Sequence, residues 1–191
     1  MRRVLLSLCL FLPFVAFGFD FDIEARTALF IPKNSTMRDL YGTGFTEYEI
    51  EMGIPLNKCF TLFSNLSYLE ADGRSSESHY RSEMENWALN FGGKYYFEPW
   101  WCLRPYVGAG AGVAHVEFRD HSPYVNNHTG KFGWSALFKL GTEWCFSRYF
   151  YVDVFADYGI NSYEFKSKNK TSGHNINTGG VKVGGGLGLR F

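Results

Sequence analysis

Strict alternation of polar and apolar residues recurs along most of this chain, and it constrains the fold more than any other feature. Residues 45–54 show it with Thr46, Tyr48, Ile50, Met52 and Ile54 on one face and Phe45, Glu47, Glu49, Glu51 and Gly53 on the other. A period of two residues is typical of β-strands whose two faces meet different surroundings. The sequence therefore predicts an all-β protein.

The alternation predicts eight strands, at residues 21–30, 44–54, 59–69, 86–97, 103–117, 132–146, 149–160 and 176–191. Most of them have about the 9–11 residues that cross a bilayer at a tilt. The connections 55–58, 98–101 and 147–148 are short, whereas 31–43, 70–85, 118–131 and 161–175 are long and polar. Because short and long connections alternate, all short turns fall at one end of an antiparallel meander and all long loops at the other. Transmembrane barrels have this asymmetry.

Glycine placement indicates which face is inside. Most strand glycines, such as Gly92, Gly110 and Gly141, share the parity of the charged residues. An eight-stranded barrel has an interior just wide enough for side chains, so the face of glycines and charges should line the lumen. The aromatic residues, which make up 19% of the chain, would then face lipid. The alternative is a soluble sandwich or lipocalin-like barrel that hides its apolar face.

The predicted lumen carries charges of both signs. Its charge network is expected to include Glu47, Glu49, Glu51, Lys94, Arg104, Lys139, Glu143, Asp153, Asp157, Lys182 and Arg190, together with Asp22, Glu24 and Arg26. Charges in a narrow interior should pair, because an unpaired buried charge is very costly. A salt-bridged plug is the favoured interpretation, since eight strands leave little room. An ion or small-solute pore is the alternative.

The first 18 residues have the pattern of a secretory signal peptide. Arg2 and Arg3 precede an almost wholly apolar stretch, and Ala16 and Gly18 provide small residues at the positions that a signal peptidase reads. The remaining residues, 19–191, are expected to form one barrel domain. The whole chain balances 19 basic against 19 acidic residues, so its charge indicates no nucleic-acid partner.

The last strand is the most specific piece of sequence. Val181, Val183, Gly185, Leu187, Leu189 and Phe191 alternate with Lys182, three glycines and Arg190. This ending resembles the C-terminal signature of Gram-negative outer-membrane proteins, and with the signal peptide and eight strands the chain resembles the small barrels of the OmpA-barrel, OmpX and OmpW superfamily. The resemblance implies an eight-stranded antiparallel up-and-down transmembrane β-barrel with short periplasmic turns and long extracellular loops. It also implies Sec-type export to the bacterial outer membrane, with Phe191 as a signal read by the barrel-assembly machinery.

Three functions remain open at this point. The first is a structural or surface-interaction role through the four external loops, with outer-membrane lipid, lipopolysaccharide and a host or surface ligand as partners and the protein as a monomer. The second is an OmpW-like channel for small solutes, and the third is an outer-membrane lipid-modifying enzyme. No phosphate-binding loop, HExxH motif or paired-cysteine zinc motif occurs, so no catalytic residue, cofactor or metal ligand is predicted and an enzyme is not expected.

Three lysines in the last long loop form the candidate anion contact. Lys166, Lys168 and Lys170 recur at every second position, so an extended backbone would place their ammonium groups on one side. Lipopolysaccharide phosphates or a sulfated host glycan would suit such a patch. A solvated loop tip is the alternative interpretation.

Cysteine usage predicts one disulfide. Cys59, Cys102 and Cys145 remain after signal cleavage, each beside a short turn and each with inward parity. Antiparallel pairing across residues 118–131 would bring Cys102 opposite Cys145, and the periplasm is oxidising. We therefore expect a Cys102–Cys145 bridge with Cys59 free. Three small buried side chains at the barrel mouth are the alternative.

Overall fold

A computed structural model describes residues 20–35, 37–38, 42–74, 81–120, 127–165 and 174–191. Its strands are β1 (Asp22–Pro32), β2 (Phe45–Pro55), β3 (Phe60–Arg74), β4 (Arg81–Tyr96), β5 (Leu103–Asp120), β6 (Asn127–Cys145), β7 (Phe150–Phe165), β8 (His174–Asn177) and β9 (Gly180–Arg190). The predicted signal peptide, residues 1–18, lies outside the described residues. Within the part that is described, no helix is long and apolar enough to cross a membrane.

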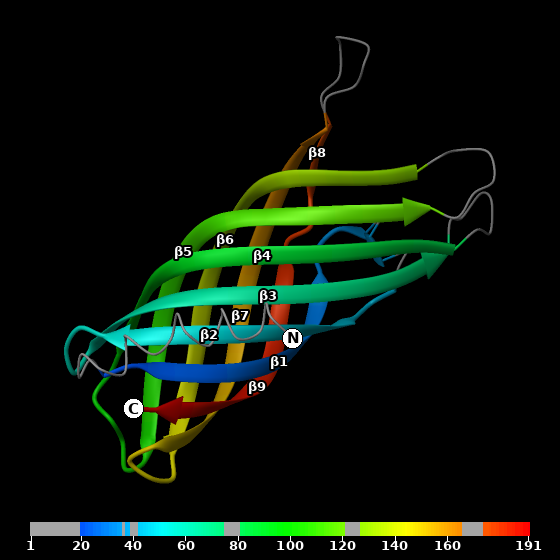
Figure 1. Cartoon of the computed structure of the whole chain (residues 1–191). Helices are drawn as coiled ribbons and strands as arrows, with labels where there is room; N and C mark the ends of the chain where they lie inside the picture. The colour runs from blue at the N-terminus through cyan, green and yellow to red at the C-terminus, as the bar shows by residue number, and fades with distance from the viewer. Residues whose placement is uncertain (1–19, 36, 39–41, 75–80, 121–126, 166–173) are drawn as a thin grey trace, which may run out of the picture.

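The strands form a closed antiparallel meander (Figure 1). β1 to β7 pair with their neighbours in sequence, and β9 returns to pair with β1 from Asp22↔Arg190 to Pro32↔Gly180. β8 and β9 both pair with β7 in one continuous register, and between them the Thr178 N–H donates to the carbonyl of Asn161 at 2.9 Å. They therefore occupy one position in the wall, and the barrel has eight strands, as the sequence predicts.

The register fixes the stagger of the barrel. Stepping from partner to partner, the path runs Asp22, Gly53, Phe63, Gly92, Gly110, Leu137, Gly159, Gly180 and Pro32. One circuit thus returns to β1 ten residues beyond its start. Closure of a sheet requires such a stagger together with tilted strands, and Figure 1 shows strands that run obliquely around the barrel.

The two ends of the barrel differ. At the turn end, β2 joins β3, β4 joins β5, and β6 joins β7. The Asn57 side chain closes the first turn by accepting from the N–H groups of Cys59 and Phe60, both at 2.9 Å. Ser147 Oγ closes the third by accepting from the N–H of Phe150 at 3.0 Å, and both patterns are common in tight turns. The loop end carries the long connections.

Burial confirms the predicted faces. Along β1 the inward residues Asp22, Glu24 and Arg26 are buried, whereas Leu29 is 52% exposed. Glycines make room in the lumen for rings from neighbouring strands. A Cβ added at Gly141 would lie 2.5 Å from the hydroxyl of Tyr106, and one at Gly188 would lie within the ring of Tyr151. The glycine positions therefore permit large polar rings inside a narrow barrel.

Five strands, β3 to β7, extend at least three residues further at the loop end than the sequence predicts. β4 begins at Arg81 and β6 at Asn127, whereas alternation predicts starts at residues 86 and 132. The extra segments are polar, and residues 70–85 and 118–131 accordingly resemble loops in sequence. Strand pairing with β3 and β5 supplies the hydrogen bonds that keep them extended.

Candidate functional site

Arg26 lies at the centre of the lumen network. Its guanidinium is within ion-pair distance of five carboxylates, those of Glu24 (3.3 Å), Glu49 (3.0 Å), Glu51 (3.5 Å), Asp153 (3.4 Å) and Asp157 (3.1 Å). One face of the group also covers the Phe155 ring at 3.5 Å. The side chain has no exposed surface, so these contacts replace its hydration entirely.

Ion pairs cross the whole width of the lumen. Lys139 on β6 pairs with Glu51 on β2 at 2.7 Å, and it also reaches Asp157 at 3.2 Å. β2 and β6 stand on opposite sides of the wall. Lys94 on β4 pairs with Glu51 as well. Side chains that touch across the barrel fill the lumen at this level.

Two smaller clusters adjoin the centre. Toward the loop end, Lys182 pairs with Glu47 at 2.6 Å and Glu49 at 3.0 Å. Toward the turn end, Glu143 is fully buried and accepts from Tyr96 at 2.6 Å. It pairs there with Arg104 at 3.3 Å and Arg190 at 2.9 Å. The structure thus brings together all eleven residues of the predicted charge network.

Sequence reasoning missed the tyrosines of this network. Tyr106 donates to Asp153 at 2.7 Å, and its ring lies under the ammonium group of Lys94 at 4.6 Å. Tyr151 donates to Glu24 at 3.4 Å. Both tyrosines share the parity of the charged residues, which would have predicted them in the lumen. Most other aromatic residues have the opposite parity, so aromatic residues as a class were predicted to face lipid.

An apolar cluster fills the lumen at the loop end. Its buried members are Phe30, Met37, Phe45, Leu69, Ala71, Met84, Ala88, Ala114, Val116 and Tyr163. Tyr163 keeps its hydroxyl satisfied by donating to Asn86 at 2.6 Å. Met37 comes from the first long connection, where no periodicity signals burial. The cluster stacks on the charged layers, so the described lumen side chains form polar and apolar layers in series.

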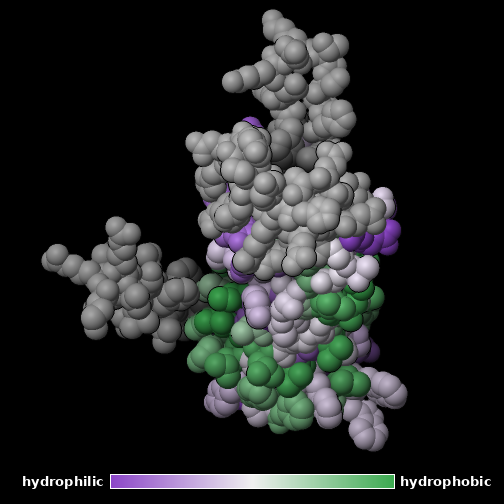
Figure 2. Space-filling view, turned by 90° about the vertical axis from the view of Figure 1, so that its right-hand side faces the viewer, coloured by the Kyte–Doolittle hydropathy of each residue, from purple (hydrophilic) through white to green (hydrophobic). Residues whose placement is uncertain are grey.

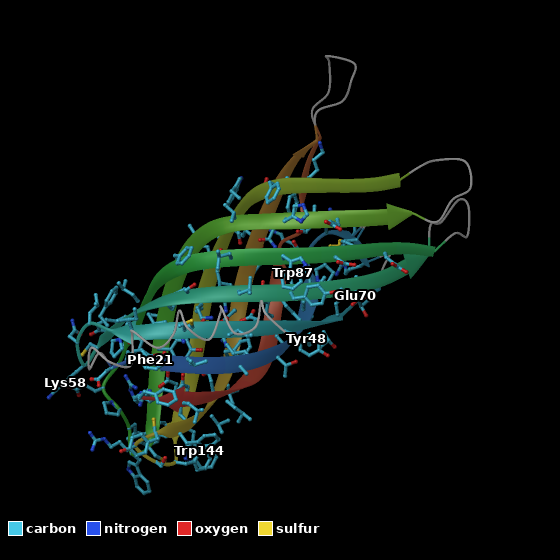
Figure 3. All side chains as sticks on the ribbon, in the orientation of Figure 1. Phe21, Tyr48, Lys58, Glu70, Trp87 and Trp144 are labelled. Atoms are coloured by element: carbon cyan, nitrogen blue, oxygen red, sulfur yellow. The ribbon has the colours of Figure 1, made fainter. Side chains whose placement is uncertain are left out.

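The outward surface is apolar between two aromatic belts. At the loop end, pairing aligns Tyr48, Tyr68, Trp87, His115 and Phe132 in one row across β2–β6. At the turn end lie the exposed side chains of Tyr95, Phe97, Phe146 and Trp144, and Figure 3 shows Trp144 at this end. About ten residues of β4 separate the belts, which matches the length of a strand that crosses a bilayer. Figure 2 shows apolar residues gathered in one zone of the surface.

Beyond the outer belt the surface becomes acidic and the sheet opens. The next outward row pairs Glu70 with Glu85 and Glu85 with Glu117. Glu70–Arg74 of β3 pair only with β4, and Asn127–Phe132 of β6 pair only with β5, among the strands described. We call this part of β3–β6 the projecting sheet. Among the strands described it has two edges without a partner strand, and Figure 1 shows β7 and β8 leaving β6 at this end.

The predicted disulfide is wrong, although the predicted pairing of its residues is right. The carbonyl of Cys102 accepts from the N–H of Cys145 at 2.9 Å, one step beyond the pair Leu103↔Trp144. All three cysteines are nevertheless free thiols, and Cys59 and Cys102 are exposed rather than turned inward. Cys102 lies in the two-residue turn that Trp101 opens with a φ of 61°, so strand parity does not extend to it. It lines an outward cavity with Trp100 and Trp144.

The remaining predicted site residues have separate positions. Phe191 stacks on Phe21 with ring centroids 4.8 Å apart, and the two residues exchange backbone hydrogen bonds. Lys166, Lys168 and Lys170 lie outside the described residues. Within the ranges described, no group of three or more His, Cys, Asp or Glu side chains is arranged to hold a metal ion.

Comparison with known proteins identifies the fold. No family model and no curated protein matches the sequence. Among solved structures, Neisserial surface protein A (NspA) matches with a TM-score of 0.59 at 14% identity, covering 90% of this chain and 97% of that one. Escherichia coli outer membrane protein W matches with 0.58 at 16% identity, covering 91% and 98%. Ail, the attachment invasion locus protein of Yersinia pestis, matches with 0.54 at 15% identity, covering 91% and 99%. The chain therefore has the fold of the small eight-stranded outer-membrane barrels.

Proposed function

We propose that this chain is a closed outer-membrane barrel that acts at the cell surface, through its loop end, as a binding protein. The observation that carries the proposal is the contrast between a lumen bridged by ion pairs, such as Lys139 to Glu51, and a projecting sheet with two open edges. A filled lumen disfavours transport. Open strand edges favour binding, because an extended peptide can add to them as a further strand.

Membrane placement in this proposal follows from the outward surface. Side chains such as Phe91, Phe138 and Leu140 are more than half exposed, and aromatic belts flank the apolar band as they do in membrane barrels. Residues 1–18 would direct Sec-type export, and the barrel-assembly machinery would read Phe191. Outer-membrane lipid and lipopolysaccharide would surround a monomer, with the loop end outside the cell.

A sulfated glycan is one ligand that such a surface binding protein would recognise. The structure of Ail was solved in complex with the heparin analogue sucrose octasulfate, and Lys166, Lys168 and Lys170 provide cationic groups in the last long loop of this chain. Each basic residue near an anionic surface contributes about 1 kcal/mol. Replacing all three lysines with glutamine should therefore weaken binding to immobilised heparin at least tenfold, whereas Lys33→Gln should not. If the triple variant binds heparin as the unaltered protein does, the three lysines are solvated loop residues and not a binding site.

An OmpW-like channel for small solutes is the second candidate. It is favoured by the likeness to outer membrane protein W and by the apolar cluster at the loop end of the lumen. Single-channel recordings in planar bilayers separate the two functions. The surface-binding proposal expects no steady conductance from the intact protein, and regular conductance steps would favour the channel. Turnover of radiolabelled phospholipid or lipid A in the same vesicles would instead indicate a lipid-modifying enzyme.

A further inference from the structure

A polar cavity lies inside the rim at the turn end. Its volume is about 490 Å³, within the usual range for small-molecule sites. The lining includes Lys58 and Arg148 from two of the short turns, Arg104 and Arg190 from the wall, and Asp20 and Asp22. Four cationic side chains therefore face two acidic side chains around one opening.

Two of these cations have no carboxylate partner. Arg104 and Arg190 are engaged with Glu143. Lys58 and Arg148 are exposed, and no ion pair joins either to another described residue. Among the described residues, the Arg148 guanidinium lies over the ring of Tyr149, 5.9 Å from its centroid. Both groups are thus available to an anion that enters the mouth.

An apolar groove lies on the outer side of the same rim. Its volume is about 540 Å³, and its floor is Ser64, a small outward residue whose strand partners are Met52 and Phe91. Ile23, Ile54 and Leu62 complete its walls. The small side chain of Ser64 leaves an apolar space between its larger neighbours, of the kind that an acyl chain fills.

The two cavities meet at the rim. Phe191 lines both of them, and it stacks on Phe21, which lines the groove. The β2–β3 connection also passes from Ile54 in the groove to Pro55 and Leu56 in the mouth. Figure 3 shows Phe21 and Lys58 together at this end. A molecule that carries an anion on a long apolar chain would occupy both cavities at once.

We propose that the mouth and the groove together bind one anionic phospholipid of the membrane leaflet at the turn end, with its phosphate at Lys58 and Arg148 and an acyl chain over Ser64. The inference rests on the membrane placement proposed above. A soluble anion would leave the groove empty, and a zwitterionic lipid would leave the extra cationic charge uncompensated. The aromatic belt at this end marks the depth at which lipid headgroups lie. The phosphate of the lipid would therefore lie at headgroup depth, and its acyl chain would lie in the apolar band.

Native mass spectrometry of the full-length protein in detergent tests the site. Phosphatidylglycerol should bind about 30-fold more tightly than phosphatidylcholine, since two surface cations contribute about 1 kcal/mol each. The Lys58→Gln/Arg148→Gln double variant should lose this preference, and Lys33→Gln, at the loop end, should keep it. Ser64→Leu should weaken both lipids by filling the groove, whereas Val113→Leu, on another part of the outward surface, should weaken neither.

Three outcomes would overturn the site. Equal binding of the two lipids by the unaltered protein would exclude selection by charge. An unchanged preference in the double variant would exclude Lys58 and Arg148 as the phosphate ligands. Displacement of phosphatidylglycerol by an equal concentration of glycerol 3-phosphate would reduce the mouth to an anion site without a lipid. Insertion of the same protein into vesicles is measured in parallel, so a protein that inserts but shows no lipid preference contradicts only this inference, and one that does not insert contradicts the proposed function.

Discussion

Arg26 is surrounded by carboxylates on β1, β2 and β7, three of which lie within about 3.3 Å of it. Removing it would leave several buried acids facing each other without a counter-charge. Breaking a buried ion pair by removing one partner typically costs 3–5 kcal/mol, so Arg26→Ala should lower the free energy of unfolding by about that amount. Arg26→Lys should cost less, because it keeps the charge but loses the planar fork.

Urea unfolding in lipid vesicles measures both Arg26 variants, with Lys33→Ala as the exposed control. Lys33 lies at the loop end and is exposed, so its loss should change stability by less than about 0.5 kcal/mol. If Arg26→Ala changes the free energy of unfolding as little as the control does, then water that enters the lumen stabilises the carboxylates in place of Arg26.

Gly141 and Gly185 offer a matched pair of glycines. A methyl group at Gly141 would meet the Tyr106 ring and displace its hydroxyl from Asp153. At Gly185, on the outward face, the nearest atom is 3.3 Å away. Gly141→Ala should therefore destabilise the barrel by about 1–3 kcal/mol, and Gly185→Ala should be nearly neutral. Equal thermal midpoints for the two variants would contradict the packing argument.

Parity in the sequence predicts which residues share the lumen, but not which of them meet. The pairing of Lys139 with Glu51 depends on the ten-residue stagger of the closed barrel, and no local pattern encodes that stagger. The cysteines show the same limit at a shorter range. Register across residues 118–131 predicts Cys102 beside Cys145, and the positive φ of Trp101 then decides where the Cys102 side chain lies.

Strand β6 carries a test of the lipid-facing surface. Phe138 is 53% exposed on the outward face, and its neighbour Lys139 is fully buried in the lumen network. Phe138→Arg should cost about 2–4 kcal/mol if the residue lies near the bilayer midplane, and Phe97→Arg, at the rim, should cost about 0–1 kcal/mol. Unfolding in vesicles compares the two. A reversed order would indicate that the apolar surface packs against protein rather than lipid.

The lengths of β3–β6 could not be predicted from alternation. Beyond the outer aromatic belt the outward face carries Glu70, Glu85 and Glu117 in place of apolar residues, so the alternation that marks a membrane-crossing strand is lost there. Glu83 and Glu85 accordingly resemble loop residues although they continue β4. The apolar cluster had a better signal, since Leu69, Met84 and Val116 have inward parity, but Met84, like Met37, Ala71 and Tyr163, lies in a segment where a loop was expected.

Assembly of the whole molecule is where Phe191 should matter most. Its ring is 56% exposed, so it contributes less than the 1.5–3 kcal/mol of a fully buried side chain. Deleting it should lower the amount of barrel in the outer membrane strongly, while the barrels that do form should keep the wild-type shift between unheated and boiled samples on a denaturing gel. Normal outer-membrane levels of the deletion variant would contradict a role in recognition by the assembly machinery.

The seam between β1 and β9 joins segments that are far apart along the chain, since residue 22 pairs with residue 190. Bringing such distant segments together has an entropic cost in an unfolded chain. Hairpins between neighbouring strands can therefore form long before β1 pairs with β9. On the inward face of this seam β9 contributes mainly glycines, three of them opposite Glu24, Arg26 and Ala28. Few inward side chains can therefore guide the seam until the other strands curve around it. Closure should be the last event of folding, and an open eight-strand sheet, with the edges of β1 and β9 unpaired in lipid, should be the species that chaperones and proteases encounter.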